Sequence, residues 1–214
     1  MGARDGRLLT TLTGRRKWIG SVAFSPDGAV LATIAADGAV ELWEAETGGL
    51  LTTLTGHEGP VVEVAFSPDC AILATASHDE TVKLWEVGTG RLITTLAKGE
   101  EFTPLAFSPD GAVLVAGGAD GTVKVWEAGT CRLIATLTEH EHAVCSVAFS
   151  PDGAVFATSS DDTTAKVWEA GSRRLVTTLT GHDDRVGSVA FSPDGTVLAT
   201  ASDDYTARIW RIEN

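Results

Sequence analysis

The chain alternates short apolar runs with clusters of turn-forming residues over its whole length. Near its end, "VGSVAF" (186–191) is followed by the turn "SPDG", by "TVLATAS" (196–202), by "DDY" and by "TARIW" (206–210). Runs of five to seven residues rich in Val, Leu, Thr and Ala, separated by such turns, predict β-strands. No segment keeps a 3.6-residue period over the length that a helix needs. The pattern therefore predicts an all-β fold.

This pattern repeats with a period of about 42 residues. The motif "FSPD" begins at five positions separated by steps of 42, 41, 42 and 42 residues: Phe24, Phe66, Phe107, Phe149 and Phe191. Five tryptophans follow with the same steps: Trp43, Trp85, Trp126, Trp168 and Trp210. The five copies fill residues 1–214, so the sequence predicts a single domain built from five repeats.

Each repeat is predicted to hold four strands. In the turn Ser-Pro-Asp-Gly, proline pre-sets φ at the second position and glycine accepts left-handed geometry at the last. After Trp43, the segment "EAETGGLLTTL" supplies a further turn and a fourth strand. In the second copy Cys70 takes the glycine position, where a side chain is expected to be mildly strained.

Four strands in a unit of about 42 residues are the signature of a β-propeller blade. The sequence resembles the WD40 family over its full length, through Gly-His pairs, an Asp-x-Thr turn and the closing tryptophans: Gly56-His57, Gly181-His182, and Asp162 with Thr164. Four copies have Trp-Glu where the family has Trp-Asp, and the last has Trp210-Arg211. The resemblance implies a propeller of five four-stranded blades.

The two ends of the chain predict how this propeller closes. The last copy reaches only its third strand, "TARIW", whereas the first residues, "GRLLTTL" (6–12), match fourth strands such as "GGLLTTL" (48–54). The N-terminal strand is therefore expected to complete the last blade and to clasp a five-blade ring shut, which removes open sheet edges. We expect a monomer. The alternative is that the clasp strand is exchanged between chains in a larger ring.

Histidine, serine and aspartate recur together, which is the combination of an acyl-transfer triad. The resemblance instead implies structural tetrads in which these residues and a tryptophan form a buried hydrogen-bond chain: His57, Ser77, Asp79 and Trp85; His140, Ser160, Asp162 and Trp168; His182, Ser202, Asp204 and Trp210. Three such sets in one chain indicate scaffolding, because catalysis needs one set in one cleft. We therefore predict no enzymatic activity and no catalytic residues.

Two copies depart from the tetrad pattern. The first has Arg15 and Ala35 at the histidine and serine positions, and the third lacks the histidine and has Gly118 in place of the serine. When the histidine and the serine are lost together, no buried donor is left without its acceptor. Blades one and three are nevertheless predicted to be the least stable.

The resemblance also implies a binding face, formed by the loops before each first strand and between the second and third strands. The residues predicted to contact a partner there are Arg15, Arg16, Lys17, Trp18, His78, Glu101, Asp161, Arg185 and Asp203. Trp18 stands out, since tryptophan and arginine are enriched at binding hot spots. The structural alternative is that Trp18 folds over the edge of its own blade. In a closed ring Arg185 would extend the patch of the first loop.

Composition restricts the partner class. The formal net charge is -13, which disfavours nucleic acid, because binding phosphates requires clustered cations. Neutral or basic protein and peptide partners are favoured. No apolar run is long enough for a membrane helix, and "MGARDGRLL" lacks the core of a signal peptide, so no membrane partner is expected. The three cysteines form no disulfide framework and favour a cytoplasmic location.

No metal or cofactor is predicted. His140 and His142 are two residues apart, so they would point to opposite faces of a strand, and no thiolate pair accompanies them. The favoured function is a non-catalytic WD40 scaffold that binds partners on its top face. The alternative is a designed, consensus-derived or recently amplified propeller, or a fragment of a longer WD40 array, with no evolved ligand.

Overall fold

A computed structural model describes residues 8–13, 19–35 and 38–212. All regular secondary structure in this part of the chain is β, as predicted, and no described segment forms a helix long and apolar enough to span a membrane. The strands, in chain order, are β1 (Ile19–Phe24), β2 (Val30–Ala35), β3 (Val40–Glu44), β4 (Leu50–Leu54), β5 (Val61–Phe66), β6 (Ile72–Ser77), β7 (Thr81–Glu86), β8 (Leu92–Lys98), β9 (Phe102–Phe107), β10 (Val113–Gly118), β11 (Val123–Glu127), β12 (Arg132–Leu137), β13 (Val144–Phe149), β14 (Val155–Ser160), β15 (Ala165–Glu169), β16 (Leu175–Leu179), β17 (Val186–Phe191), β18 (Val197–Ser202) and β19 (Ala207–Arg211).

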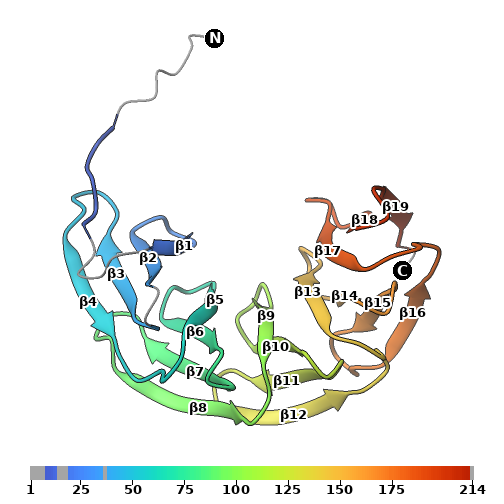
Figure 1. Cartoon of the computed structure of the whole chain (residues 1–214), viewed down its shortest axis with the longest axis horizontal. Helices are drawn as coiled ribbons and strands as arrows, with labels where there is room; N and C mark the ends of the chain where they lie inside the picture. Colours follow the sequence, from blue (N-terminus) through green and yellow to red (C-terminus); the bar gives the residue numbers. More distant parts are fainter. Residues whose placement is uncertain (1–7, 14–18, 36–37, 213–214) are drawn as a thin grey trace.

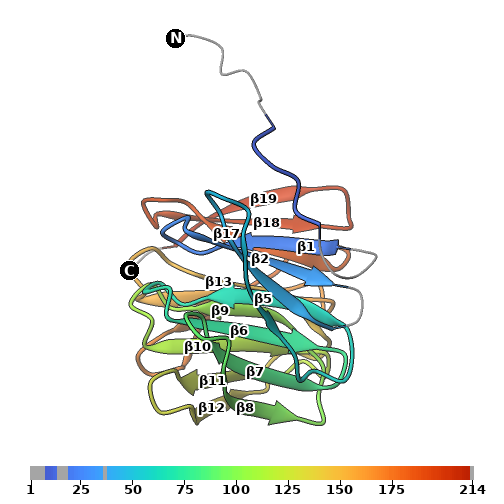
Figure 2. The same cartoon turned by 90° about the vertical axis from the view of Figure 1, so that its left-hand side faces the viewer.

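The strands form five antiparallel sheets, one for each sequence repeat, which we number as blades one to five. Blades one to four have four strands each, in sequential order, and blade five consists of β17, β18 and β19. Figure 1 shows the blades fanned into an arc, with the first strand of each blade on the concave side and β4, β8, β12 and β16 along the outside. In the perpendicular view of Figure 2 the strands are layered from β1 and β17–β19 near the top to β8 and β12 at the bottom.

The recurring turn between the first two strands explains why each repeat folds alike. In the first copy Ser25 Oγ donates to Asp27 Oδ1 at 2.5 Å, and the same carboxylate oxygen accepts the Ala29 N–H at 3.0 Å. Gly28 closes the turn at φ 72°. Cys70 occupies the corresponding position at φ 61°, which confirms that a side chain is held there in left-handed backbone.

Four apolar clusters join successive blades. In the first, Val40 and Leu42 of blade one pack against Val64, Leu73 and Trp85 of blade two. The other three clusters repeat this arrangement at the next three junctions, so each inner blade is apolar on both faces. The core of the protein is therefore a series of layers between blades, and a blade at the end of the series has one layer missing.

Among the described residues the five blades do not form the predicted closed ring. The sheet of blade five has three strands, and residues 8–13 form no strand with β19 but lie at blade one. A closed five-blade ring requires about 72° between neighbouring blades. The described blades instead leave a gap between β1 and β17–β19 (Figure 1), and residues 8–13 lie apart from the last blade.

Candidate functional site

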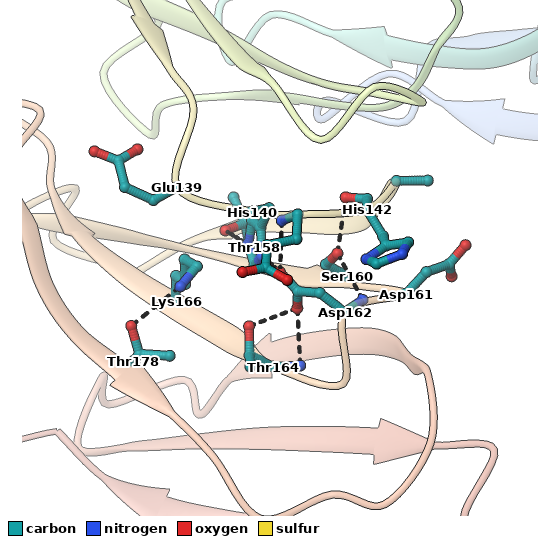
Figure 3. A network of polar contacts seen from close by, with 12 residues as sticks. Glu139, His140, His142, Thr158, Ser160, Asp161, Asp162, Thr164, Lys166 and Thr178 are labelled. Carbon is teal, nitrogen blue, oxygen red and sulfur yellow. Dashed lines mark hydrogen bonds and ion pairs between the residues drawn. The ribbon is translucent and has the colours of Figure 1, made fainter.

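A buried polar network lies inside blade four (Figure 3). The indole N–H of Trp168 donates to Thr158 Oγ1 at 2.9 Å, and the same hydroxyl lies 2.8 Å from His140 Nε2. His140 Nδ1 lies 2.6 Å from Asp162 Oδ2, and the other oxygen of this carboxylate accepts the backbone N–H of Thr164 at 3.0 Å. Blades two and five repeat this network with Trp85, Thr75, His57 and Asp79, and with Trp210, Thr200, His182 and Asp204.

The serine assignment in the predicted tetrads is wrong. Ser77 does not link tryptophan to histidine; it donates to Gly59 O at 3.0 Å and accepts the Asp79 N–H at 3.1 Å. Ser160 and Ser202 make the same loop contacts. The linking hydroxyl belongs to the threonine two residues earlier, which points to the same face of the strand. The recurrence of threonine at 33, 75, 158 and 200 was the signal that sequence reasoning missed.

Burial determines the protonation of these networks. Burial lowers the pKa of His57 and of His140 below the ordinary value, although Asp79 and Asp162 favour the protonated imidazoles. Burial alone would raise the pKa of Asp79, but hydrogen bonds from Thr81, the Glu58 N–H and His57 outweigh it and hold that pKa at about 2. The geometry therefore favours a neutral imidazole in contact with an ionised carboxylate.

The network geometry does not resemble a hydrolytic triad. Both ring nitrogens of His140 are occupied by Thr158 and Asp162, and Thr158 is fully buried. Ser160 Oγ donates to a loop carbonyl at 2.9 Å instead of facing the imidazole. A nucleophile must be within reach of both its base and a substrate. These contacts suit a structural role.

Blades one and three hold their tryptophans differently. In blade one Trp43 still donates to Thr33 Oγ1 at 2.9 Å. In blade three Ala116 stands at the threonine position, and the buried Phe102 packs edge-on against Trp126 with ring centroids 6.1 Å apart. Lys124 Nζ lies 5.1 Å from the Phe102 ring centroid. An aromatic contact thus replaces the polar network there; sequence reasoning missed it, and the low stability expected for both blades stays a prediction.

Five residues predicted to bind a partner lie in the described loops at one end of the blades; we call His78, Glu101, Asp161, Arg185 and Asp203 the loop-face residues. His78 Nδ1 lies 2.8 Å from Glu101 Oε1 in the next blade. Arg185 Nε lies 2.9 Å from Asp161 Oδ1 of the preceding blade, and Arg185 Nη1 is 3.9 Å from Asp203 Oδ2. The loop-face residues therefore form two exposed groups, each spanning two blades.

The first-loop residues of that prediction lie outside the described residues: Arg15, Arg16, Lys17 and Trp18. The described strands of blades one and five are separated by the opening of the arc (Figure 1), and the expected continuity between Arg185 and the first loop stays a prediction.

A thiol belongs to one of these groups. Cys145 Sγ lies 3.0 Å from Asp161 Oδ1, and Arg185 Nε lies 3.4 Å from the same sulfur. Burial, together with the hydrogen bond to Asp161, raises the pKa of the Cys145 thiol against the opposing effect of Arg185. All three cysteines are free thiols.

A cavity of about 530 Å³ opens on the concave side beside these loops, lined by β5, β9 and β13 and reached by Asp161 and Arg185. Glu63 projects from β5 into its lining, and burial raises the pKa of that carboxyl to about 6. No cation lies within ion-pair distance of Glu63 among the described residues. Sequence reasoning missed Glu63, although the other blades have Ser21, Pro104, Ser146 and Ser188 at this position.

The radial sheets and the repeated Trp-Thr-His-Asp networks define a protein of the β-propeller class. The family model of the second β-propeller of echinoderm microtubule-associated protein matches residues 64–214, and that of the WD domain, G-beta repeat, matches residues 6–44. The chain therefore belongs to the WD40-repeat β-propeller family. Families of this kind are generally non-catalytic scaffolds that bind proteins or peptides. A search of curated proteins gave no match.

Proposed function

We propose that the chain is a non-catalytic scaffold that binds a protein or peptide carrying basic side chains, on the loop face and in the adjoining concave cavity. The observation that carries the proposal is the cavity of about 530 Å³, whose lining holds the half-buried Glu63 together with Asp161 and Arg185. The end of the blades with the Ser-Pro-Asp turns repeats almost unchanged, whereas the loop-face positions differ from blade to blade. Variation at one end only is typical of a framework that carries a recognition surface.

Glu63 is the expected anchor for a basic side chain. Burial raises its pKa to about 6, so the ionised carboxylate is disfavoured in the free protein. A lysine or arginine entering the cavity would stabilise the ionised form by a charge-assisted hydrogen bond. The formal net charge of -13 acts in the same direction, since it attracts basic partners at long range.

The loop-face residues are expected to orient the rest of the partner. Asp161 and Arg185 are about half exposed, with side-chain exposures of 43% and 50%, so their ion pair is open to competition from a bound peptide. Exposed pairs of this kind contribute little stability by themselves. A partner that carries both acidic and basic side chains can therefore replace this ion pair with its own ion pairs at a low cost in free energy. Arg15, Arg16, Lys17 and Trp18 are proposed to contribute from the first loop.

Selection of linear peptides from a random display library on the immobilised protein tests this function. The enriched peptides are expected to contain Lys or Arg, and their affinities are then measured by fluorescence anisotropy. Glu63→Gln and Asp161→Asn should each weaken binding about tenfold or more, which corresponds to about 1.4 kcal/mol. Glu46→Gln, an exposed carboxylate in the β3–β4 turn, is the matched control and should leave affinity unchanged. Enriched peptides without basic residues, or insensitive to both variants, would contradict the proposal.

A further inference from the structure

One face of blade five exposes side chains that every other blade buries. Ile209 on β19 is 76% exposed, whereas the residues at its position in the other blades are at most 1% exposed: Leu42, Leu84, Val125 and Val167. Ala199, Ala201 and Ala207 on the same sheet are also exposed. In the other blades this face packs against the next blade. The outer face of blade five therefore has the apolar residues of a blade–blade contact without a blade packed on it in the described structure.

The opposite face is exposed on blade one. Val22 is 60% exposed, whereas Val64, Leu105 and Val189 at its position are between 6% and 8% exposed. Phe24 on the same strand is 61% exposed. Next to it, a hollow of about 300 Å³ is lined by Leu31 and Trp43 together with the N-terminal segment. In the other blades this face packs against the preceding blade. It is therefore the surface that would pack against the exposed face of blade five.

The N-terminal segment already occupies the place of a fourth strand from a preceding blade. A Cβ built on Gly48 would lie 2.7 Å from Thr10 Cγ2 and 2.9 Å from Leu12 Cδ2. A Cβ built on Gly90, the equivalent glycine of blade two, would lie 2.9 Å from Thr52 Cγ2 and 3.2 Å from Leu54 Cδ2 of β4. Residues 8–12 therefore lie on blade one as β4 lies on blade two. Leu8 and Leu9 are 77% and 81% exposed there.

Among the described residues, no three strands pair with this segment as β1–β3 do with β4. Blade five has three strands and, within the described part of the chain, β19 pairs only with β18. The sequence "LLTTL" at residues 8–12 is identical to that of β4, which pairs with the third strand of its own blade. In the described part of the chain, residues 8–12 and β19 are separated by the opening of the arc (Figure 1) and make no contact with each other.

We propose that the two ends are the halves of one blade–blade interface, and that their partner is a second copy of this chain joined head to tail. Residues 8–12 of one copy pair with β19 of the other and complete its blade five. The first blade of the copy that donates residues 8–12 then packs Val22 and Phe24 against Ile209 of the other copy. The contact joins two different surfaces, so it is heterologous and propagates to a ring or a filament. It also covers an exposed strand edge, which otherwise invites non-specific pairing.

Multi-angle light scattering across a dilution series tests the assembly. The wild-type chain should show a concentration-dependent mass of at least twice 22.3 kDa. Ile209→Asp and Val22→Asp should each give the 22.3 kDa monomer, because each places a charge in the contact. Both sites are exposed in the single chain, so unchanged thermal melting of the monomer checks that folding is retained. Leu133→Asp, at a 47% exposed apolar position on the outer strand β12, is the matched control and should assemble like the wild type.

Mixing the two monomeric variants separates head-to-tail contact from other association. The Ile209→Asp chain keeps an intact first blade, and the Val22→Asp chain keeps an intact last blade. Their mixture should therefore form a complex of two chains, although neither variant associates alone. A wild-type mass of 22.3 kDa at every concentration would overturn the proposal. The proposal would also be overturned if both variants assembled like the wild type, or if their mixture stayed monomeric.

Discussion

The imidazole Nε2 of His140 lies 2.8 Å from Thr158 Oγ1, inside a blade where both side chains are buried. The same hydroxyl accepts the indole N–H of Trp168 at 2.9 Å. The hydroxyl of one threonine therefore hydrogen-bonds to two side chains that come from different segments of the blade. Buried networks of this kind stabilise when every member has its partner.

Replacing Thr158 by valine should destabilise the protein more than replacing Ser160 by alanine. Thr158→Val leaves the Trp168 donor and the His140 ring nitrogen without a partner, at a cost of about 2–4 kcal/mol. Ser160→Ala removes loop contacts at the network's edge, at a cost of about 1 kcal/mol. Urea denaturation of both variants measures the difference. Equal losses, or a larger loss for Ser160→Ala, would show that the serine and not the threonine is the link.

The stability of the fold should fall in two stages on acidification. The lowered pKa values of His57 and His140 mean that, below the ordinary value of 6.5, the unfolded chain binds protons that the folded chain does not. The free energy of unfolding should therefore decrease as the pH falls through that value. A second decrease is expected between pH 3.8 and about 2, where Asp79 is protonated in the unfolded but not in the folded chain.

Denaturant titrations at a series of pH values measure both stages. His140→Gln should flatten the upper stage, because the unfolded chain then has one fewer histidine to protonate. His142→Gln is the matched control, since His142 is exposed and only its backbone carbonyl contacts Ser160. A free energy of unfolding that stays constant from pH 8 to pH 5 would contradict the prediction.

Cys70→Gly should stabilise the protein by about 1 kcal/mol, because Cys70 has φ 61° where left-handed backbone disfavours a side chain. Gly28→Ala at the equivalent position of blade one is the reciprocal variant. A Cβ at Gly28, with φ 72°, meets no atom within 4 Å, so only the backbone conformation opposes it. The two changes should shift the unfolding midpoint in opposite directions. Shifts of the same sign would rule out backbone strain as the cause.

Glu63→Gln should stabilise the protein at neutral pH while weakening peptide binding. The pKa of Glu63 is raised from 4.5 to about 6, so the folded state loses stability as the pH rises through this interval and the carboxyl ionises. The variant removes that loss, and its advantage over the wild type should grow between pH 4.5 and about 6. Thermal melting at pH 4 and pH 8 measures it. The same advantage at both values would assign the effect to packing.

The sequence predicted the blades well because their signals are local. The Ser-Pro-Asp-Gly turns, the period of about 42 residues and the closing tryptophans each act within one repeat, and the strands follow them. The choice between Ser77 and Thr75 was not local. Both point to the same face of β6, and only the positions of His57 and Trp85 relative to that strand decide which hydroxyl joins them.

Ring closure and the cavity depend on how blades pack, which no single repeat encodes. The angle between blades is the sum of many contacts such as those of Leu42 and Leu73, and a small change per junction opens the ring. Glu63 shows the same limit, since one unusual residue on β5 becomes informative only when the folded chain partly buries it.

The most direct test of this account is amide hydrogen exchange at residues 207–211 of β19, measured in dilute and in concentrated solution. An arc whose ends associate between copies predicts slower exchange at the higher concentration in the wild type and in Leu133→Asp, and fast exchange at both concentrations in Ile209→Asp. Equally slow exchange in dilute and concentrated wild type would show that the strand is covered within a single chain, and would contradict the open arc.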